Sequence, residues 1–236
     1  MLSCIHGNLP ALLSVDRDIA ACAPDRVLCL GDIVGYGAQP RECIDLVHAR
    51  GWPTILGNHE AAVLDDKACE DFNPVAWMAI NYTRGVVTEA DRAWMRTLPE
   101  TMEEDGYQIA HGSTAGARPF KYVLTDQDAD DALLAATRPV VFIGHTHIAI
   151  GFHRSGGLTQ CKDPIQVVAP NTSAVINVGS VGQPRDKDPR ASWVLYDTVT
   201  RQAEWRRVTY DIADAAERIR SAGLPEKLAH RLASGT

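Results

Sequence analysis

Five short segments of the sequence each combine a glycine with side chains that can bind a metal ion. They are 3–8 (SCIHGN), 31–32 (GD), 57–60 (GNHE), 111–113 (HGS) and 144–147 (GHTH). Each segment lies at the end of a short run that reads as a strand. Imidazole and carboxylate groups suit zinc, iron or manganese, and one carboxylate can bridge two ions. One histidine beside a glycine is usually an ordinary loop residue, but five such segments at strand ends are not expected by chance.

The last of these segments indicates more than one ion. His145 and His147 alternate along an extended stretch, so their side chains diverge and can reach two neighbouring ions. Two ions about 3.5–4 Å apart form the usual clamp for in-line displacement at phosphorus. The residue types and their spacing therefore predict hydrolysis or transfer at a phosphoryl group.

The elements that must position these segments alternate between short strands and helices. Helices are predicted over 9–23 and from Pro40 and Pro74, and 211–234 reads as two short helices broken at 223–225. Strands are predicted at 27–30, 54–56, 107–110, 140–143 and 175–178, and a late hairpin or edge pair at 192–196 and 203–208. This alternation predicts an α/β layered fold, in which the carboxyl ends of the strands gather the site.

The composition restricts the environment and the partners of the chain. Hydrophobic residues make up 45% of the 236 residues and no apolar run is long enough to cross a bilayer, so we expect no membrane partner. The N-terminus lacks the pattern of a secretory signal, which favours a cytoplasmic protein. A net charge of −7 without any basic run argues against binding a long nucleic acid. The six cysteines form no CxxC pair, and nothing in the sequence predicts an oligomeric state.

The five segments, together with 177–186 (NVGSVGQPRD), resemble the motifs of the calcineurin-like metallophosphoesterase superfamily, in particular its small bacterial phosphodiesterases and phosphatases. The resemblance runs from Ser3 to Asp186. It implies an α/β/β/α sandwich, in which two facing mixed β-sheets are flanked by helices. We expect one such domain over 1–236, with 211–236 as a C-terminal helical tail.

Carried over residue by residue, the resemblance implies two divalent or trivalent transition-metal ions, each zinc, iron or manganese. The first ion would be held by Cys4, His6, Asp32 and His147, and the second by Asp32, Asn58, His111 and His145. A hydroxide between the two ions would attack phosphorus. His59 would bind no metal but would stabilise the transition state or protonate the leaving oxygen, because an imidazole pKa lies near the working pH.

The sequence departs from the family at two places. Cys4 occupies the position of the first-motif aspartate, and only Met1 to Ser3 precede it, where the family has a full first strand. As a thiolate, Cys4 would keep the negative charge of that aspartate and bind the first ion. The other interpretation is a buried thiol that binds nothing. Residues 31–37 (GDIVGYG) also lack the acidic and arginine residues of the protein serine/threonine phosphatases.

This second departure favours small phosphate monoesters or diesters as substrates, with nucleotides among the candidates. Asn8, Tyr36 and Arg185 are candidate substrate-binding residues, since a guanidinium matches phosphate oxygens in a bidentate manner. The alternative for Arg185 is a salt bridge to Asp186 or Asp188. Two other functions stay open: a nuclease-type phosphodiesterase, and a catalytically weak metal-binding scaffold that docks a partner protein.

Overall fold

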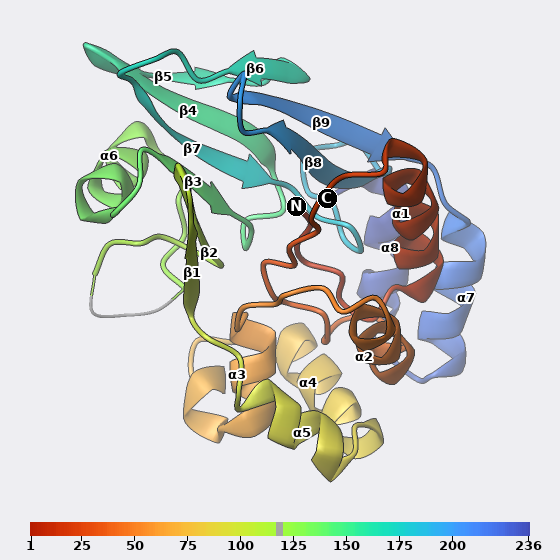
Figure 1. Cartoon of the computed structure of the whole chain (residues 1–236). Coiled ribbons are helices and arrows are strands. Elements are labelled where there is room, and N and C mark those ends of the chain that lie inside the picture. The colour runs from red at the N-terminus through yellow and green to blue at the C-terminus, as the bar shows by residue number, and fades with distance from the viewer. Residues whose placement is uncertain (117–119) are drawn as a thin grey trace.

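The computed structural model describes residues 1–116 and 120–236 and has helices on both sides of two β-sheets (Figure 1). The helices are α1 (Leu9–Cys22), α2 (Pro40–Ala49), α3 (Asn58–Leu64), α4 (Pro74–Val86), α5 (Glu89–Met95), α6 (Asp126–Ala135), α7 (Ile212–Ser221) and α8 (Glu226–Ser234), with a 3-10 turn at Asp66–Cys69. The strands are β1 (Thr101–Glu104), β2 (Tyr107–Ala110), β3 (Val140–Ile143), β4 (Ala149–Ser155), β5 (Gly157–Cys161), β6 (Ile165–Val167), β7 (Ser173–Val178), β8 (Ala191–Asp197) and β9 (Gln202–Val208).

The larger sheet is mixed and has the strand order β1-β2-β3-β7-β4-β5. Its centre is parallel, with Val140 of β3 opposite Tyr107 of β2 and Ala174 of β7. The smaller sheet is antiparallel and has the order β6-β9-β8. The pairing of β8 with β9 confirms the predicted late hairpin.

The two sheets face each other across a shared hydrophobic core. Along β3, Val140 and Phe142 point into this core, where they meet Val194 of β8 and Trp205 of β9. The alternate residues of β3 point to the other face of the larger sheet, which α6 covers. Since both faces of β3 are buried, its sequence is a continuous apolar run. This arrangement of two facing sheets is the predicted α/β/β/α sandwich.

The first part of the chain contributes single bridges rather than strands. Leu2 pairs in parallel with Cys29, and Cys29 with Thr54, so the predicted strands at 27–30 and 54–56 are wrong in extent. The physical reason lies directly after the Cys29 bridge, where Gly31 and Asp32 have φ angles of +84° and +57° and end the extended conformation. The direction of these pairings still brings the ends of the segments to one edge of the molecule.

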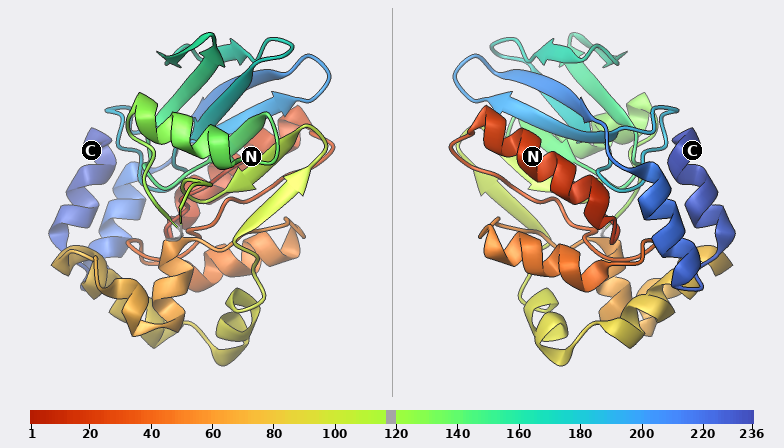
Figure 2. Two further views of the ribbon diagram at one scale, coloured as in Figure 1. Left: turned by 90° about the vertical axis from the view of Figure 1, so that its left-hand side faces the viewer. Right: turned by 90° about the vertical axis from the view of Figure 1, so that its right-hand side faces the viewer.

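The remaining helices surround this edge (Figure 2). Buried apolar side chains of α1 and α2 pack against β8. Those of α7 and α8 pack against each other and against α4. The helices α7 and α8 confirm the two short helices predicted in 211–234. No helix in the described residues is both long enough and apolar enough to span a membrane.

A polar contact fastens α1 to the smaller sheet. The Asp18 carboxylate accepts hydrogen bonds from Trp193 Nε1 at 2.9 Å and from Arg206 Nε and Nη2 at 2.9 and 3.1 Å. The hydrogen bonds from Arg206, and to a lesser extent that from Trp193, lower the pKa of Asp18, although partial burial opposes the shift. One carboxylate therefore joins the helix to both β8 and β9.

We expect Asp18→Ala to lower the free energy of unfolding by about 1–3 kcal/mol, because it leaves an indole N–H and a guanidinium without their charged acceptor. Asp25→Ala, at an exposed loop position, is the control and should change it little. Chemical denaturation measures both. Because the pKa of Asp18 is lowered in the folded state, its contribution is complete above about pH 4 and disappears as the pH falls further. Equal stability of the two variants at pH 7 would contradict this role.

Candidate metal centre and active site

The predicted metal ligands converge into two buried groups that share one carboxylate. The first group is Cys4, His6, Asp32 and His147, and the second is Asp32, His111 and His145. Within each group the potential ligand atoms lie within 4.8 Å of one another. The segments that carry these residues come from the N-terminus, from the loops after Cys29 and β2, and from the loop after β3. Asp32 is the only residue common to both groups among those the structure describes.

An unusual backbone conformation turns most of these side chains inward. Left-handed φ angles between +51° and +64° occur at Cys4, His6, Asp32, His145 and His147. Residues other than glycine rarely adopt this conformation, which costs energy and is concentrated at functional sites. Backbone hydrogen bonds hold two of these loops together, since His6 N donates to Asp32 O at 2.9 Å and Cys4 N to Gly31 O at 3.0 Å.

The tautomers of three histidines follow from their hydrogen bonds. The Nδ1 atoms of His6, His111 and His147 lie 2.6–3.0 Å from the backbone oxygens of Val34, Leu30 and Gln183, respectively. A carbonyl oxygen only accepts, so each Nδ1 carries the proton and donates it. In the neutral imidazole the lone pair is then on Nε2, which is the arrangement typical of histidines that bind a metal.

The orientation of His6 and His147 fits a cation. Their Nε2 atoms are 3.0 Å apart, and burial lowers the pKa of both far enough to keep them neutral at pH 7. Two lone pairs therefore face each other at hydrogen-bond distance with no proton between them. Asp32 Oδ2 is also buried and makes no hydrogen bond within the described residues. A positive ion placed among these atoms would satisfy all three.

Asn58 lies beside the second group, to which His145 belongs. Asn58 is the first residue of α3, and its Oδ1 lies 3.2 Å from His111 Nε2. Burial and the neighbouring His111 lower the pKa of His145 to about 3, so its ring is neutral. Burial also acts to lower the pKa of His111, but the Asp32 carboxylate, 3.1 Å away, outweighs it and raises that pKa. The nitrogen and oxygen donors of this group match what transition-metal ions such as zinc, iron and manganese accept.

The Cys4 thiol points into the first group. Its Sγ lies 3.3 Å from Ser3 Oγ and accepts a hydrogen bond from His145 N at 3.3 Å. Burial and the charge of Asp32 raise the thiol pKa far above its usual value. In the protein alone the group is therefore a neutral thiol, and a bound cation would be required to make it a thiolate.

His59 lies beside both groups but belongs to neither. Its backbone N–H donates to Asp32 Oδ1 at 2.9 Å, and its ring packs against those of His6, Tyr36 and Phe72. Burial lowers its pKa to about 4, and its Nδ1 has no hydrogen-bond partner in the described residues. A Cβ atom at Gly35 would lie 2.0 Å from this Nδ1, so a glycine is required there. The ring is thus held next to the metal groups while it stays free to meet a substrate.

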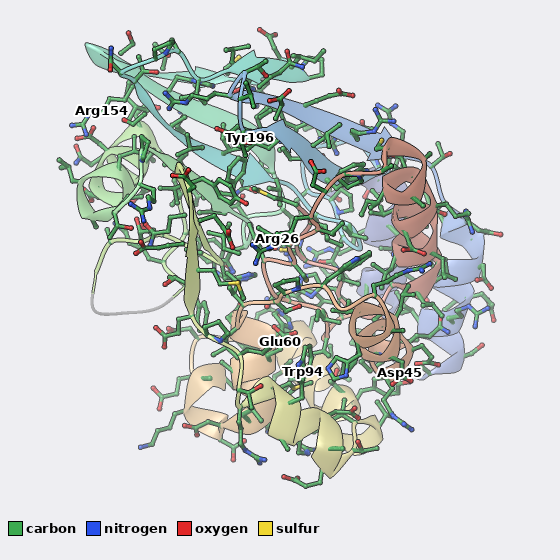
Figure 3. The ribbon with its side chains drawn as sticks, viewed as in Figure 1. Arg26, Asp45, Glu60, Trp94, Arg154 and Tyr196 are labelled. Carbon is green, nitrogen blue, oxygen red and sulfur yellow. The ribbon has the colours of Figure 1, made fainter. Side chains whose placement is uncertain are left out.

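Glu60 is the last residue of the segment 57–60, and its role was not predicted from the sequence. It is completely buried, and its carboxylate accepts backbone hydrogen bonds of 2.7–3.1 Å from Asp32, Ile33, Val34 and Gly57. Burial and the charge of Asp32 raise its pKa. Figure 3 shows Glu60 at the start of α3, toward the interior of the molecule. The available signal was an acidic residue at the third position of a helix that follows a glycine, as in a capping box.

A cavity opens onto the metal groups, and two of the three predicted substrate-binding residues line it. Tyr36 and Arg185 border it together with Asp32, His59 and His147. Asn8 does not. Its Oδ1 accepts from Ala11 N at 3.2 Å as the cap of α1, and its Nδ2 donates to Gly182 O at 2.9 Å. Because both polar atoms of Asn8 are used within the fold, substrate contact is not the role that its position supports.

Two aromatic residues at the cavity were missed in the sequence. Tyr122 stacks on His145, with ring centroids 4.0 Å apart and planes inclined by 14°, and about half of its surface is exposed. Phe72 also lines the cavity, where its ring packs against that of His59. Neither residue lies in a recognisable motif, so only the folded chain reveals them.

Comparison with known proteins gives the family of the chain. Residues 1–201 match the model of the calcineurin-like phosphoesterase superfamily domain. An uncharacterised protein of Methanocaldococcus jannaschii is 34% identical over 239 residues, which cover 100% of this chain and 97% of that protein. A metallophosphoesterase from Sphaerobacter thermophilus, 34% identical, superposes with a TM-score of 0.84 over 100% of this chain and 98% of its own.

A hypothetical protein from Pyrococcus horikoshii shares the fold, with a TM-score of 0.81 at 19% identity over 100% of this chain and 97% of its own. The resemblance noted in the motifs is thus confirmed along the chain. The protein belongs to the calcineurin-like phosphoesterase superfamily.

Proposed function

We propose that this protein hydrolyses small phosphate esters with two metal ions that share Asp32. The observation that carries the proposal is the pair of buried ligand groups with one common carboxylate, in which the Nε2 lone pairs of His6 and His147 face each other. Cys4, His6, Asp32 and His147 would hold one ion, and Asp32, Asn58, His111 and His145 the other. Metal ions bound there would supply Lewis-acid activation of water and of the phosphoryl group.

The chain's own residues then bind and orient the substrate. Arg185 borders the cavity and can donate to phosphoryl oxygens through its planar guanidinium. His59, held by its backbone bond to Asp32, would present its ring to the leaving oxygen and, as a neutral imidazole with a pKa of about 4, would give it a hydrogen bond rather than a proton. Tyr36 contacts both the His59 ring, at 4.5 Å between centroids, and the Arg185 guanidinium, whose Cζ is 5.6 Å from the Tyr36 ring centroid, so it helps to keep these two groups in place.

The size of the substrate follows from the charge and the depth of the site. The chain carries a net charge of −7, which disfavours a long polyanion. The ligand groups are buried, so the reacting phosphoryl group has to enter a narrow cavity. Small monoesters or diesters, nucleotides among them, fit these limits better than a nucleic acid strand.

Asp32→Asn tests the proposal directly. The variant should lose both ions, because it removes the charge that allows two cations to lie close together. Elemental analysis after saturation with manganese, iron or zinc should find two ions per wild-type chain, with turnover of an aryl phosphate monoester or diester. Asp45→Asn, on the outer surface of α2 (Figure 3), is the matched control and should keep both ions and the activity. One ion or none in the wild type, without turnover, would favour a scaffold instead.

His59→Ala should keep both ions while kcat falls by about 10²–10⁴-fold, the usual effect of removing a group that assists the leaving oxygen. The reason is that His59 lies outside both ligand groups. His230→Ala, at an exposed position of α8, serves as the control and should leave kcat unchanged. Loss of a metal ion from the His59 variant would contradict the assignment.

Cys4→Ser should lose the first ion preferentially, whereas Cys4→Asp should keep two ions and shift the preference from zinc or iron toward manganese, since carboxylate is the harder ligand. With cobalt, the wild type should show a sulfur-to-metal charge-transfer band that both variants lack. Cys161→Ser, at a half-buried position outside both ligand groups, is the control and should retain the band. A metal-bound structure with Sγ beyond about 3 Å from the ion, well outside the Zn–S bonding distance of about 2.3 Å, would exclude ligation.

A further inference from the structure

Two arginines from distant parts of the chain meet beside the metal groups. Arg185 lies in the loop after β7, and Arg231 lies on α8 near the C-terminus. Gln183 Oε1 accepts a hydrogen bond from both, at 2.9 Å from Arg185 Nη2 and at 3.2 Å from Arg231 Nη1. Both guanidinium groups therefore converge on one neutral amide oxygen.

This arrangement adjoins the candidate metal centre. The backbone oxygen of Gln183 accepts from His147 Nδ1 at 2.6 Å, and Arg185 N donates to His147 O at 3.0 Å. Arg185 itself lines the cavity that contains Asp32 and His59. Any ligand that reaches the guanidinium of Arg185 from the cavity is thus next to the phosphoryl site.

No carboxylate of the described chain neutralises these two charges. The acidic residues nearest to Arg185 in sequence have other partners, because Asp186 pairs with Arg207, and Asp188 with Arg190. Within residues 1–116 and 120–236, neither Arg185 nor Arg231 has a carboxylate within 4.0 Å. The Nε atoms of both are buried without a hydrogen-bond partner in the same residues. The alternative that Arg185 is used in a salt bridge to its neighbours is therefore wrong.

The fold holds the two cations together although they repel each other. Arg231 is held by the packing of α8, because Leu228 and Leu232 of this helix are buried against α7 and α4. The end of α8 is fastened to the Arg185 loop, because Lys187 N donates to Gly235 O at 2.8 Å. Figure 2 shows α7 and α8 as a pair at one side of the molecule. Burial and the charge of Arg185 lower the pKa of Arg231, a direction that agrees with an uncompensated cation.

We propose that Arg185 and Arg231 bind a second phosphoryl group of the substrate, directly linked to the one that lies at the metal centre. This inference rests on the proposed function, since it assumes that the first phosphoryl group binds among the metal ligands. Two guanidinium groups carry two positive charges, and a phosphoryl dianion is the ligand that matches both their charge and their forked geometry. The substrate class is then a compound with a diphosphate linkage, such as a nucleoside diphosphate or its ester.

The test compares two stable ligands that differ by one phosphoryl group. Methylphosphonate and methylenediphosphonate are titrated by calorimetry into the manganese-loaded protein. The wild type should bind methylenediphosphonate at least about tenfold more tightly. Arg231→Gln should reduce that preference by about 10- to 100-fold, the effect of losing one charge-assisted contact to phosphate. Arg231→Lys keeps the charge but lacks the fork, so its preference should be intermediate.

The control is Arg220→Gln, because Arg220 lies on the neighbouring helix α7 and is already paired with Glu226. It should keep the wild-type preference. Stronger chelation of manganese by methylenediphosphonate would be equal in all variants, so a preference that survives in Arg231→Gln would overturn the inference. Equal affinity of the wild type for both ligands would also overturn it, because the second phosphoryl group would then add nothing to binding.

Calorimetry needs no turnover, so the inference and the proposed function can fail separately. If the protein hydrolyses an aryl phosphate but shows no preference for the diphosphonate, the proposed phosphoesterase activity stands and the second phosphoryl subsite is wrong. Melting temperatures of the three arginine variants show whether each is folded. If Arg231→Gln is unfolded, the Arg231→Lys variant decides, since it keeps the aliphatic stem and the positive charge of the side chain.

Discussion

One buried carboxylate that accepts four backbone hydrogen bonds sets the geometry of the candidate metal centre. Glu60 joins the start of α3 to the loop that carries Asp32, so two segments almost thirty residues apart in sequence become one unit. Asn58 and His59 belong to the same helix start, and their positions relative to Asp32 are therefore determined by the backbone. Burial and the charge of Asp32 raise the pKa of Glu60 to about 7, and the backbone hydrogen bonds act in the opposite direction because they stabilise the charged carboxylate.

Around this unit, burial determines the protonation state of the neighbouring histidines. His6, His145 and His147 are neutral because a charged imidazole would be poorly solvated there. The candidate metal centre thus presents the lone pairs of neutral histidines and the carboxylate of Asp32. Such a set of groups attracts cations strongly and anions poorly, so the cationic Arg185, which lines the same cavity, supplies the positive charge that an anionic substrate needs.

Sequence reasoning predicted most of the site because its residues follow strand ends, where parallel pairing brings them together. Asp32 and His111 are found in this way without any knowledge of the fold. Glu60, Tyr122 and Arg231 were not, since their roles depend on contacts between segments that no local pattern links. Asn8 shows the opposite error, because the side chain of a polar residue beside a helix start can be used entirely by the cap.

The left-handed backbone at five of the seven candidate ligands has a consequence for the biology of the metal. Because the main chain already points these side chains inward, one ion can replace another without any rearrangement of the loops. Such a centre would discriminate between ions by the chemistry of its donors and by the supply of each ion, and not by a rearrangement of its loops. The ions recovered with the protein would then depend on which metals the producing cell supplies. A change in that supply would change the metal content, and with it the activity, of the same chain.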